Sequence, residues 1–265
     1  MTRMRADAAL VDAGLFPSRA RAHAAILAGQ VKIGSQPVDK AGQQVEEGTV
    51  FEVAASQQYV SRGGHKLAAA LDAFRLDPTG MRVLDVGAST GGFTDCVLQR
   101  GAAAVTALDV GYGQLAWSLR TDPRVTVLER TNIRSAEGPL PGAPFDLAVI
   151  DVSFIGLVKV LPFVLAQLGE AGQVVGLVKP QFEAGKGRVG KRGVVRDPEV
   201  HADVLRTVAR AAVELGWVVR GVTFSPVKGP EGNIEFLLWL ARDGESSDFT
   251  PEAMVTAARE ALGGG

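Results

Sequence analysis

The fold is decided by the stretch Val83-Leu84-Asp85-Val86-Gly87-Ala88-Ser89-Thr90-Gly91-Gly92-Phe93-Thr94, an apolar strand that runs into a glycine-rich turn and then a helix. In open α/β sheets, ligand sites form where such a strand ends. From about Gly63 onward, strand-like and helix-like segments alternate. This alternation predicts an α/β fold with a mostly parallel sheet and helices on both faces.

Hydrophobic periodicity predicts the elements on either side of this stretch. Strands are expected at 82–86, 104–110, 125–128, 146–150 and 173–178, and helices at 65–74, 92–100, 114–119, 157–168 and 198–215. Two further strands, 217–224 and 234–240, are joined by a Pro/Gly-rich turn and predict an antiparallel edge. A last helix is expected at 251–262.

Composition places the chain among globular proteins. Its 265 residues include 28 Lys and Arg against 29 Asp and Glu, with 46% hydrophobic and 22% charged residues. The single cysteine, Cys96, is expected in the core and fits a reducing cytoplasm. We expect no secretory signal and no membrane span, because the longest apolar stretch, 145–168, is interrupted by Asp146, Asp151 and Lys159.

The first fifty-five residues differ in character from the rest. Helices are expected at 7–13 and 18–28, followed by short strands at 31–33, 36–38 and 50–53. Residues 1–35 carry five basic side chains against two acidic ones. The small, polar residues that follow read as a linker. We therefore predict a first domain at 3–55, a linker at 56–62 and a second domain at 63–262.

Charge alone favours a solvated helix face for these basic residues over a nucleic-acid surface. The residue order of this region, however, resembles the S-four-type RNA-binding domain. The resemblance rests on Leu15-Phe16-Pro17-Ser18-Arg19-Ala20-Arg21-Ala22, Ile26-Leu27-Ala28-Gly29-Gln30-Val31-Lys32-Ile33 and Gly34-Ser35-Gln36-Pro37-Val38. The resemblance implies that RNA is bound by basic residues, and we expect these to be Arg3, Arg5, Arg19, Arg21 and Lys32.

The glycine turn favours one kind of nucleotide cofactor. Its spacing is not G-x-G-x-x-G, which disfavours a dinucleotide and an NAD-dependent dehydrogenase. A carboxylate such as Asp85 suits a ligand with cationic sulfonium and ammonium groups, as in S-adenosylmethionine. Asp109 is placed to hold two ribose hydroxyls, and Asn132 to contact the adenine edge or cap a turn. Expected cofactor contacts are Asp85, Gly87, Ala88, Ser89, Thr90, Gly91, Gly92, Asp109 and Asn132; no metal site is expected.

Motifs that are missing from the chain limit the kinds of group that could accept a methyl group. The fourth strand is followed by Asp151-Val152-Ser153-Phe154 and not by an Asn-Pro-Pro-Tyr-like element, so the marker of base amino-group methylation is missing. A hydroxyl acceptor remains, and it needs a base. Lys179 and Lys66 are candidates, provided that burial or a nearby cation favours a neutral amine.

Lys66, Asp151, Lys179 and Glu235 resemble the Lys-Asp-Lys-Glu tetrad of the FtsJ-type 2′-O-methyltransferases. With an S-four-type domain in front, the chain resembles the TlyA family, often labelled "hemolysin". The resemblance implies a Rossmann-like, cytoplasmic enzyme that uses S-adenosylmethionine to methylate cytidine 2′-hydroxyls of ribosomal RNA within ribosomal subunits. Our hypothesis gives Lys179 the role of base and lets Lys66 stabilise the oxyanion, while Asp151 and Glu235 orient the lysines.

The segment 179–196 carries six basic residues against Glu183 and several glycines. We expect Lys186, Arg188, Lys191 and Arg192 to contact the RNA backbone, a solvated loop being the alternative. His201, early in a long helix, is expected on the surface. Two other functions stay open: a non-catalytic RNA-binding or ribosome-assembly factor, and a membrane-lytic hemolysin, which the missing signal and span disfavour.

Overall fold

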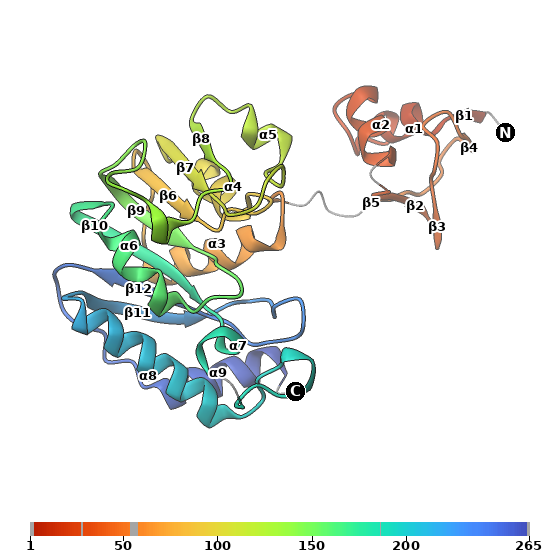
Figure 1. The fold of residues 1–265 in the computed structure, drawn as a ribbon. Helices are drawn as coiled ribbons and strands as arrows, with labels where there is room; N and C mark the ends of the chain where they lie inside the picture. The colour runs from red at the N-terminus through yellow and green to blue at the C-terminus, as the bar shows by residue number, and fades with distance from the viewer. Residues whose placement is uncertain (1–2, 28, 54–57, 186, 264–265) are drawn as a thin grey trace. The chain divides into compact units, whose positions relative to one another are not determined.

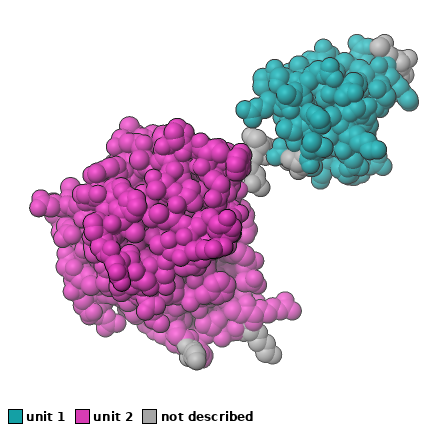
Figure 2. Space-filling model, turned by 45° about the horizontal axis from the view of Figure 1, so that its top comes forward, with its two compact units in different colours: residues 1–58 teal, residues 59–265 magenta. Residues whose placement is uncertain are grey.

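The computed structural model describes residues 3–27, 29–53, 58–185 and 187–263. The chain divides into two compact units, residues 1–58 and 59–265 (Figures 1 and 2). Of the expected linker, residues 56–57 lie outside the described residues, and the first helix of the second unit begins at Arg62. Each unit has its own hydrophobic core.

The first unit combines two helices with two small sheets. Its elements are β1 (Arg3–Arg5), α1 (Ala6–Asp12), α2 (Arg19–Leu27), β2 (Val31–Ile33), β3 (Gln36–Pro37), β4 (Gln44–Glu46) and β5 (Glu52–Val53). One sheet has the order β3-β2-β5, and β1 pairs with β4 in the other. The helices and the first sheet were expected, but the β1–β4 pair was not. Leu10, Ile26 and Val31 form the centre of the core.

The second unit is built on one seven-stranded sheet with the order β11-β12-β10-β9-β6-β7-β8. Its strands are β6 (Arg82–Val86), β7 (Ala104–Leu108), β8 (Val125–Leu128), β9 (Phe145–Ile150), β10 (Leu168–Val178), β11 (Val218–Phe224) and β12 (Phe236–Ala241). The five strands from β10 to β8 are parallel, whereas β12 runs antiparallel to both β10 and β11. This confirms the predicted fold class, including the antiparallel edge.

Helices cover both faces of this sheet (Figure 1). They are α3 (Arg62–Phe74), α4 (Gly92–Gln99), α5 (Trp117–Arg120), α6 (Leu161–Leu165), α7 (Pro180–Glu183), α8 (Pro198–Glu214) and α9 (Pro251–Leu262). Apolar residues of α3 and α4 pack in one core cluster, and those of α6, α8 and α9 in another. Cys96 is buried in the first cluster, as predicted. In the described part of the chain, no helix is both long and apolar enough to cross a membrane.

One predicted helix, 157–168, is interrupted and ends earlier than expected. The expected helix 157–168 is a short 3₁₀ turn, Leu157–Lys159, followed by α6, and β10 already begins at Leu168. Gly169 and Gly172 follow Leu168, and glycine lowers helix stability by about 1 kcal/mol per position. The pairing of β10 with β9 shifts register between Leu168 and Gln173, which accommodates these residues in the strand.

Candidate active site

Three neighbouring parallel strands end at one edge of the sheet and place the site. Gly87 follows β6, Asp151 follows β9, and Lys179 follows β10. Strand β9 pairs with both β6 and β10, so the three strand ends lie next to one another. This is the edge at which open parallel sheets bind ligands.

Two cavities of about 420 and 470 Å³ open at this edge. They share five lining residues, namely Gly87, Ser89, Asp151, Ser153 and Phe154. We call the first the tetrad cavity, because it is lined by Lys66, Asp151, Lys179 and Glu235, and the second the Asp109 cavity. Asp151 thus stands at the boundary between the two.

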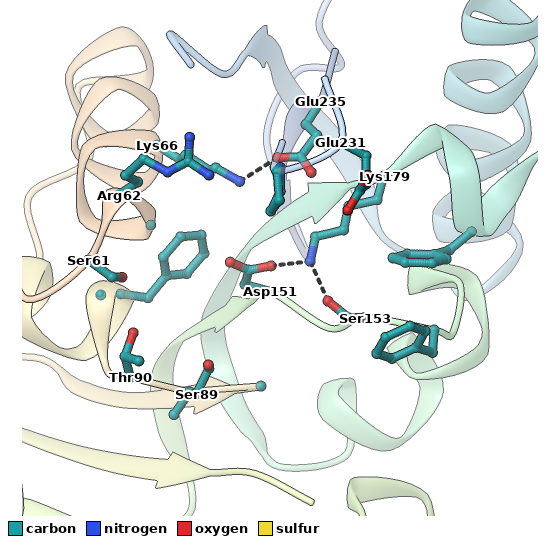
Figure 3. A pocket seen from close by; sticks show the side chains of 18 of the residues that line it. Ser61, Arg62, Lys66, Ser89, Thr90, Asp151, Ser153, Lys179, Glu231 and Glu235 are labelled. Carbon is teal, nitrogen blue, oxygen red and sulfur yellow. Dashed lines mark hydrogen bonds and ion pairs between the residues drawn. The ribbon is translucent and has the colours of Figure 1, made fainter. Parts of the chain in front are cut away.

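The tetrad cavity holds two ion pairs (Figure 3). Lys66, from α3, pairs with Glu235, the residue before β12, and both side chains are buried. Lys179 Nζ lies 2.6 Å from Asp151 Oδ1. The four residues predicted from the sequence are therefore brought together from positions up to 169 residues apart. Each lysine side chain thus has a carboxylate partner in the cavity.

Sequence reasoning missed five polar residues of this cavity: Ser61, Arg62, Ser153, Gln181 and Glu231. Ser153 accepts a hydrogen bond of 2.9 Å from Lys179 Nζ, and Arg62 lines the cavity beside Lys66. Both lie in stretches that carry recognised motifs, two residues after Asp151 and four before Lys66. Their proximity to recognised residues is the only signal that could have singled them out.

The glycine turn is shaped by close backbone contact. Gly87 has a φ of +87°, and a Cβ atom there would lie 2.5 Å from the carbonyl oxygen of Asp151. Only glycine fits such a position. Gly91 also has a positive φ, but it packs against Leu115 and Leu119 and lines neither cavity. The structure therefore does not bring Gly91, a predicted cofactor contact, to either cavity.

The other residues of the turn divide between the cavities. Gly87 and Ser89 line both, whereas Ala88, Thr90 and Gly92 line only the tetrad cavity. The residues predicted to contact the cofactor therefore do not all line the Asp109 cavity, and three of them line only the tetrad cavity.

The Asp109 cavity combines a carboxylate with apolar walls. Asp109 accepts hydrogen bonds from the backbone N–H of Ser89 at 2.8 Å and of Gly111 at 2.6 Å, which fix its carboxylate. Asn132 lines the cavity and also caps a turn, since its Oδ1 accepts from the Arg134 N–H. The walls include Val86, Leu108, Ile133, Ile155 and Val160. An apolar slot with a fixed acid at one end suits a nucleoside with a ribose diol.

Asp85, a predicted cofactor contact, lies in the interior of the second unit. Its side chain is fully buried, accepts a 2.6 Å hydrogen bond from the Thr94 hydroxyl and lines neither cavity. Burial raises the pKa of Asp85 to about 7. The side chain points into the layer between the sheet and α4, so the structure does not bring this predicted cofactor contact to either cavity.

The basic residues of the first unit are exposed and partly organised. Arg5 pairs through two nitrogens with Asp7, and Arg19 reaches the same carboxylate at 3.1 Å. These arginines lower the pKa of Asp7 to about 2, chiefly through the Arg5 hydrogen bonds. Arg3, Arg21 and Lys32 are exposed as well. The structure therefore leaves all five predicted RNA contacts accessible.

The four residues predicted to contact RNA in the segment 179–196 differ in their surroundings. Arg188 is exposed but pairs with Asp203 of α8 at 2.5 Å, and Arg192 is exposed with a φ of +63°. Lys191 begins a short 3₁₀ turn, and Lys186 lies outside the described residues. His201 was expected on the surface, but it is only 1% exposed because its side of α8 faces the sheet.

Comparison with known proteins is consistent with this geometry. The family model of the FtsJ-like methyltransferases matches residues 59–242, and that of the S4 domain matches residues 4–51. A 16S/23S rRNA (cytidine-2′-O)-methyltransferase, TlyA of Mycobacterium tuberculosis, is 52% identical over 240 residues, which cover 90% of each chain.

Two further matches span most of the chain. Hemolysin A of Brachyspira hyodysenteriae is 37% identical over 235 residues, covering 88% of this chain and 98% of that protein. A solved structure of a provisionally named hemolysin from Streptococcus thermophilus is 43% identical, covers 99% of this chain and 98% of its own, and superimposes with a TM-score of 0.75.

Proposed function

The chain belongs to the FtsJ-like methyltransferase family, and from this premise we propose that it transfers a methyl group from S-adenosylmethionine to the 2′-hydroxyl of cytidine in ribosomal RNA. The observation that carries the proposal is the tetrad cavity, in which two lysine–carboxylate pairs adjoin a nucleoside-sized cavity. The acceptor and its macromolecular context follow the name of the 52% identical relative.

The Asp109 cavity fits the cofactor. Asp109 would accept hydrogen bonds from the ribose diol, because each carboxylate oxygen keeps acceptor capacity beside its backbone contact. Asn132 would face the adenine edge, and the apolar walls would cover the ring. S-adenosylmethionine supplies an electrophilic methyl group on a sulfonium. Gly87 and Ser89 line both cavities and would accompany the amino-acid part towards the tetrad.

Lys179 is the group that we assign to accept the 2′-hydroxyl proton. A neutral amine has two N–H donors and one lone pair. Asp151 and Ser153 both lie within hydrogen-bond distance of Lys179 Nζ and would occupy the two donors. The lone pair of Nζ would then remain available to accept the 2′-hydroxyl proton.

Lys66 and Glu235 have the complementary role. Lys66 lines the same cavity as Lys179, and its ammonium is held by Glu235. A fixed cation stabilises the negative charge that develops on the ribose oxygen, and it needs no reorganisation during the reaction. Positioning of the two reactants would supply most of the remaining rate enhancement.

RNA recognition is assigned to both units. The exposed arginines of the S4 domain, whose boundaries we keep at 3–55, would contact phosphates, as would Arg188 and Arg192. To contact a phosphate, Arg188 would have to break its ion pair with Asp203. Work on ribosomal subunits would keep the protein in the cytoplasm.

The test is transfer of a radiolabelled methyl group to ribosomal subunits by the purified protein. We expect wild-type protein to label RNA at cytidine 2′-oxygens, and Lys179→Ala to lose the activity while still binding S-adenosylmethionine. Lys159→Ala removes an exposed lysine outside both cavities and serves as the control. Undiminished turnover by Lys179→Ala would remove Lys179 from the role of base, and absence of any labelling by wild type would overturn the proposal.

A further inference from the structure

A third cavity, of about 200 Å³, lies outside the two cavities described above. It is bounded by residues 194–196, by α8 and α9, and by residues 228–234 of the loop between β11 and β12. Four basic side chains line it: Arg196, His201, Lys228 and Arg259. They come from four different parts of the second unit and converge only through the fold.

The three permanent cations of this cavity are held by backbone carbonyls or face solvent. Arg259 donates to the carbonyl of Arg196 at 2.8 Å, and Lys228 donates to the carbonyl of Gly263 at 2.8 Å. Among the residues that the structure describes, no carboxylate oxygen lies within 4.0 Å of these three side chains. The one acid in the lining, Glu231, is exposed. Three cations against one exposed acid in the lining leave a net positive charge, which creates a positive potential inside the cavity.

His201 gives the cavity a buried polar wall. The residue is 1% exposed; the Val195 backbone lies beside its ring, but neither ring nitrogen makes a hydrogen bond of good geometry in the described structure. Its ring packs edge-on against Phe236, with 5.8 Å between ring centroids. Burial, assisted by the charge of Arg259, lowers the pKa of His201 to about 4, so the imidazole is neutral near pH 7 and keeps one N–H donor. Buried polar groups are almost always paired, which indicates that a ligand or solvent completes this site.

The cavity is connected to the tetrad cavity through the loop that carries Glu235. Glu231 lines both cavities. Asn233, which is 1% exposed, accepts from the Val195 N–H and donates to the Gly193 carbonyl, each at 2.9 Å. These bonds join the end of the basic segment to the residues next to Glu235. A group bound between Arg196 and Lys228 would therefore contact both sides of this junction.

We propose that this cavity binds a phosphate group, and that in the working enzyme it is a backbone phosphate of the RNA substrate, outside the reacting nucleotide. Guanidinium groups form paired hydrogen bonds with phosphate oxygens, and the neutral imidazole adds a further donor. The RNA assignment rests on the proposed function, whereas the phosphate chemistry rests on the cavity alone.

The phosphate site is tested by nuclear magnetic resonance of the histidine rings in the full chain. The chain has three histidines, His23, His65 and His201, so the ring signals are few. We expect inorganic phosphate, added at constant ionic strength against chloride, to shift the His201 signals saturably and to leave the other two in place. Arg259→Gln should abolish the shift. A His201 signal that is indifferent to phosphate would overturn the site.

The RNA assignment is tested by binding of an rRNA fragment at several salt concentrations. Arg259→Gln and Arg196→Gln should each weaken binding several-fold and reduce the slope of log affinity against log salt by about one. Arg210→Gln removes an exposed charge of α8 outside the cavity and should leave the slope within error. Lys228→Gln provides a third variant should either arginine variant unfold.

The outcomes separate the two proposals. If the Arg259 and Arg196 variants bind RNA with the wild-type slope, the RNA assignment is wrong, whatever the methylation assay shows. If wild type binds RNA through these residues but transfers no methyl group, the proposed reaction fails and the phosphate contact stands.

Discussion

Lys179 donates a 2.9 Å hydrogen bond to Ser153, a residue that follows the neighbouring strand and lines both cavities. Ser153→Ala removes the acceptor that helps to aim the amine. We expect kcat to fall about tenfold, which corresponds to the ~1.4 kcal/mol of one positioned hydrogen bond. Ser153→Thr keeps the hydroxyl and should restore most of the rate. Equal kcat in wild type and Ser153→Ala, measured at saturating RNA, would exclude this positioning role.

The Lys66–Glu235 pair can be tested for stability and for catalysis separately. Glu235→Ala leaves a buried ammonium without a partner and should lower the free energy of unfolding by about 3 kcal/mol. The double variant Lys66→Met/Glu235→Leu removes both charges and should regain much of that stability. It should nevertheless be inactive. A double variant that methylates RNA would show that the pair is structural only.

Gly87 and Gly113 form a matched pair of glycines. Both have a positive φ, +87° and +71°, so alanine costs about 1 kcal/mol of backbone strain at either position. Only at Gly87 does the new Cβ collide, 2.5 Å from the Asp151 carbonyl oxygen, whereas nothing lies within 4 Å at Gly113. Gly87→Ala should therefore abolish S-adenosylmethionine binding in calorimetry, and Gly113→Ala should retain it. Similar affinities for both variants would contradict the assigned contact.

Asp85 should make the second unit less stable as pH rises. Its pKa is about 7 in the folded chain and near its ordinary 3.8 when unfolded, so between these values the folded state binds more protons. The free energy of unfolding then falls from about pH 4 to about pH 7. Asp85→Asn removes this contribution, and its stability relative to wild type should increase over the same range by up to a few kcal/mol.

The measurement is urea unfolding followed by tryptophan fluorescence at pH 5 and pH 8. All three tryptophans, Trp117, Trp217 and Trp239, lie in the second unit and report on it alone. His201 has a lowered pKa and changes stability in the opposite direction, being fully stabilising only above its ordinary 6.5. Because His201 is present in both proteins, the difference between Asp85→Asn and wild type isolates Asp85. A pH-independent difference would show that Asp85 is ionised in the folded chain.

Much of the fold was predictable because buried parallel strands carry an apolar signal. The expected bounds of β6, β8 and α9 agree with the structure to the residue. The strand β1, Arg3–Arg5, escaped prediction because two of its three residues are charged and its partner β4 is far along the chain. The start of β10 escaped because Leu168 continues a helical pattern and only pairing with β9 makes it a strand.

The candidate site shows the same division. Asp151 and Lys179 could be placed because each follows a recognisable apolar strand, whereas Lys66 and Glu235 joined the set only through the resemblance to the FtsJ-type tetrad. The direction in which a side chain points could not be predicted from the sequence. For that reason Asp85 was assigned to the ligand, although its side chain hydrogen-bonds Thr94 in the interior. The burial of His201 depends on which side of α8 meets Phe236, which the helical period alone left undecided.

The contact between Lys66 and Glu235 joins positions 169 residues apart, near the two ends of the second unit. During synthesis, the first of these residues leaves the ribosome long before the second exists. Loop closure of this length must wait for the segment that carries Glu235, so a nascent chain that ends before Glu235 lacks the completed tetrad. An enzyme arranged in this way cannot modify RNA until Glu235 has been synthesised and has reached Lys66.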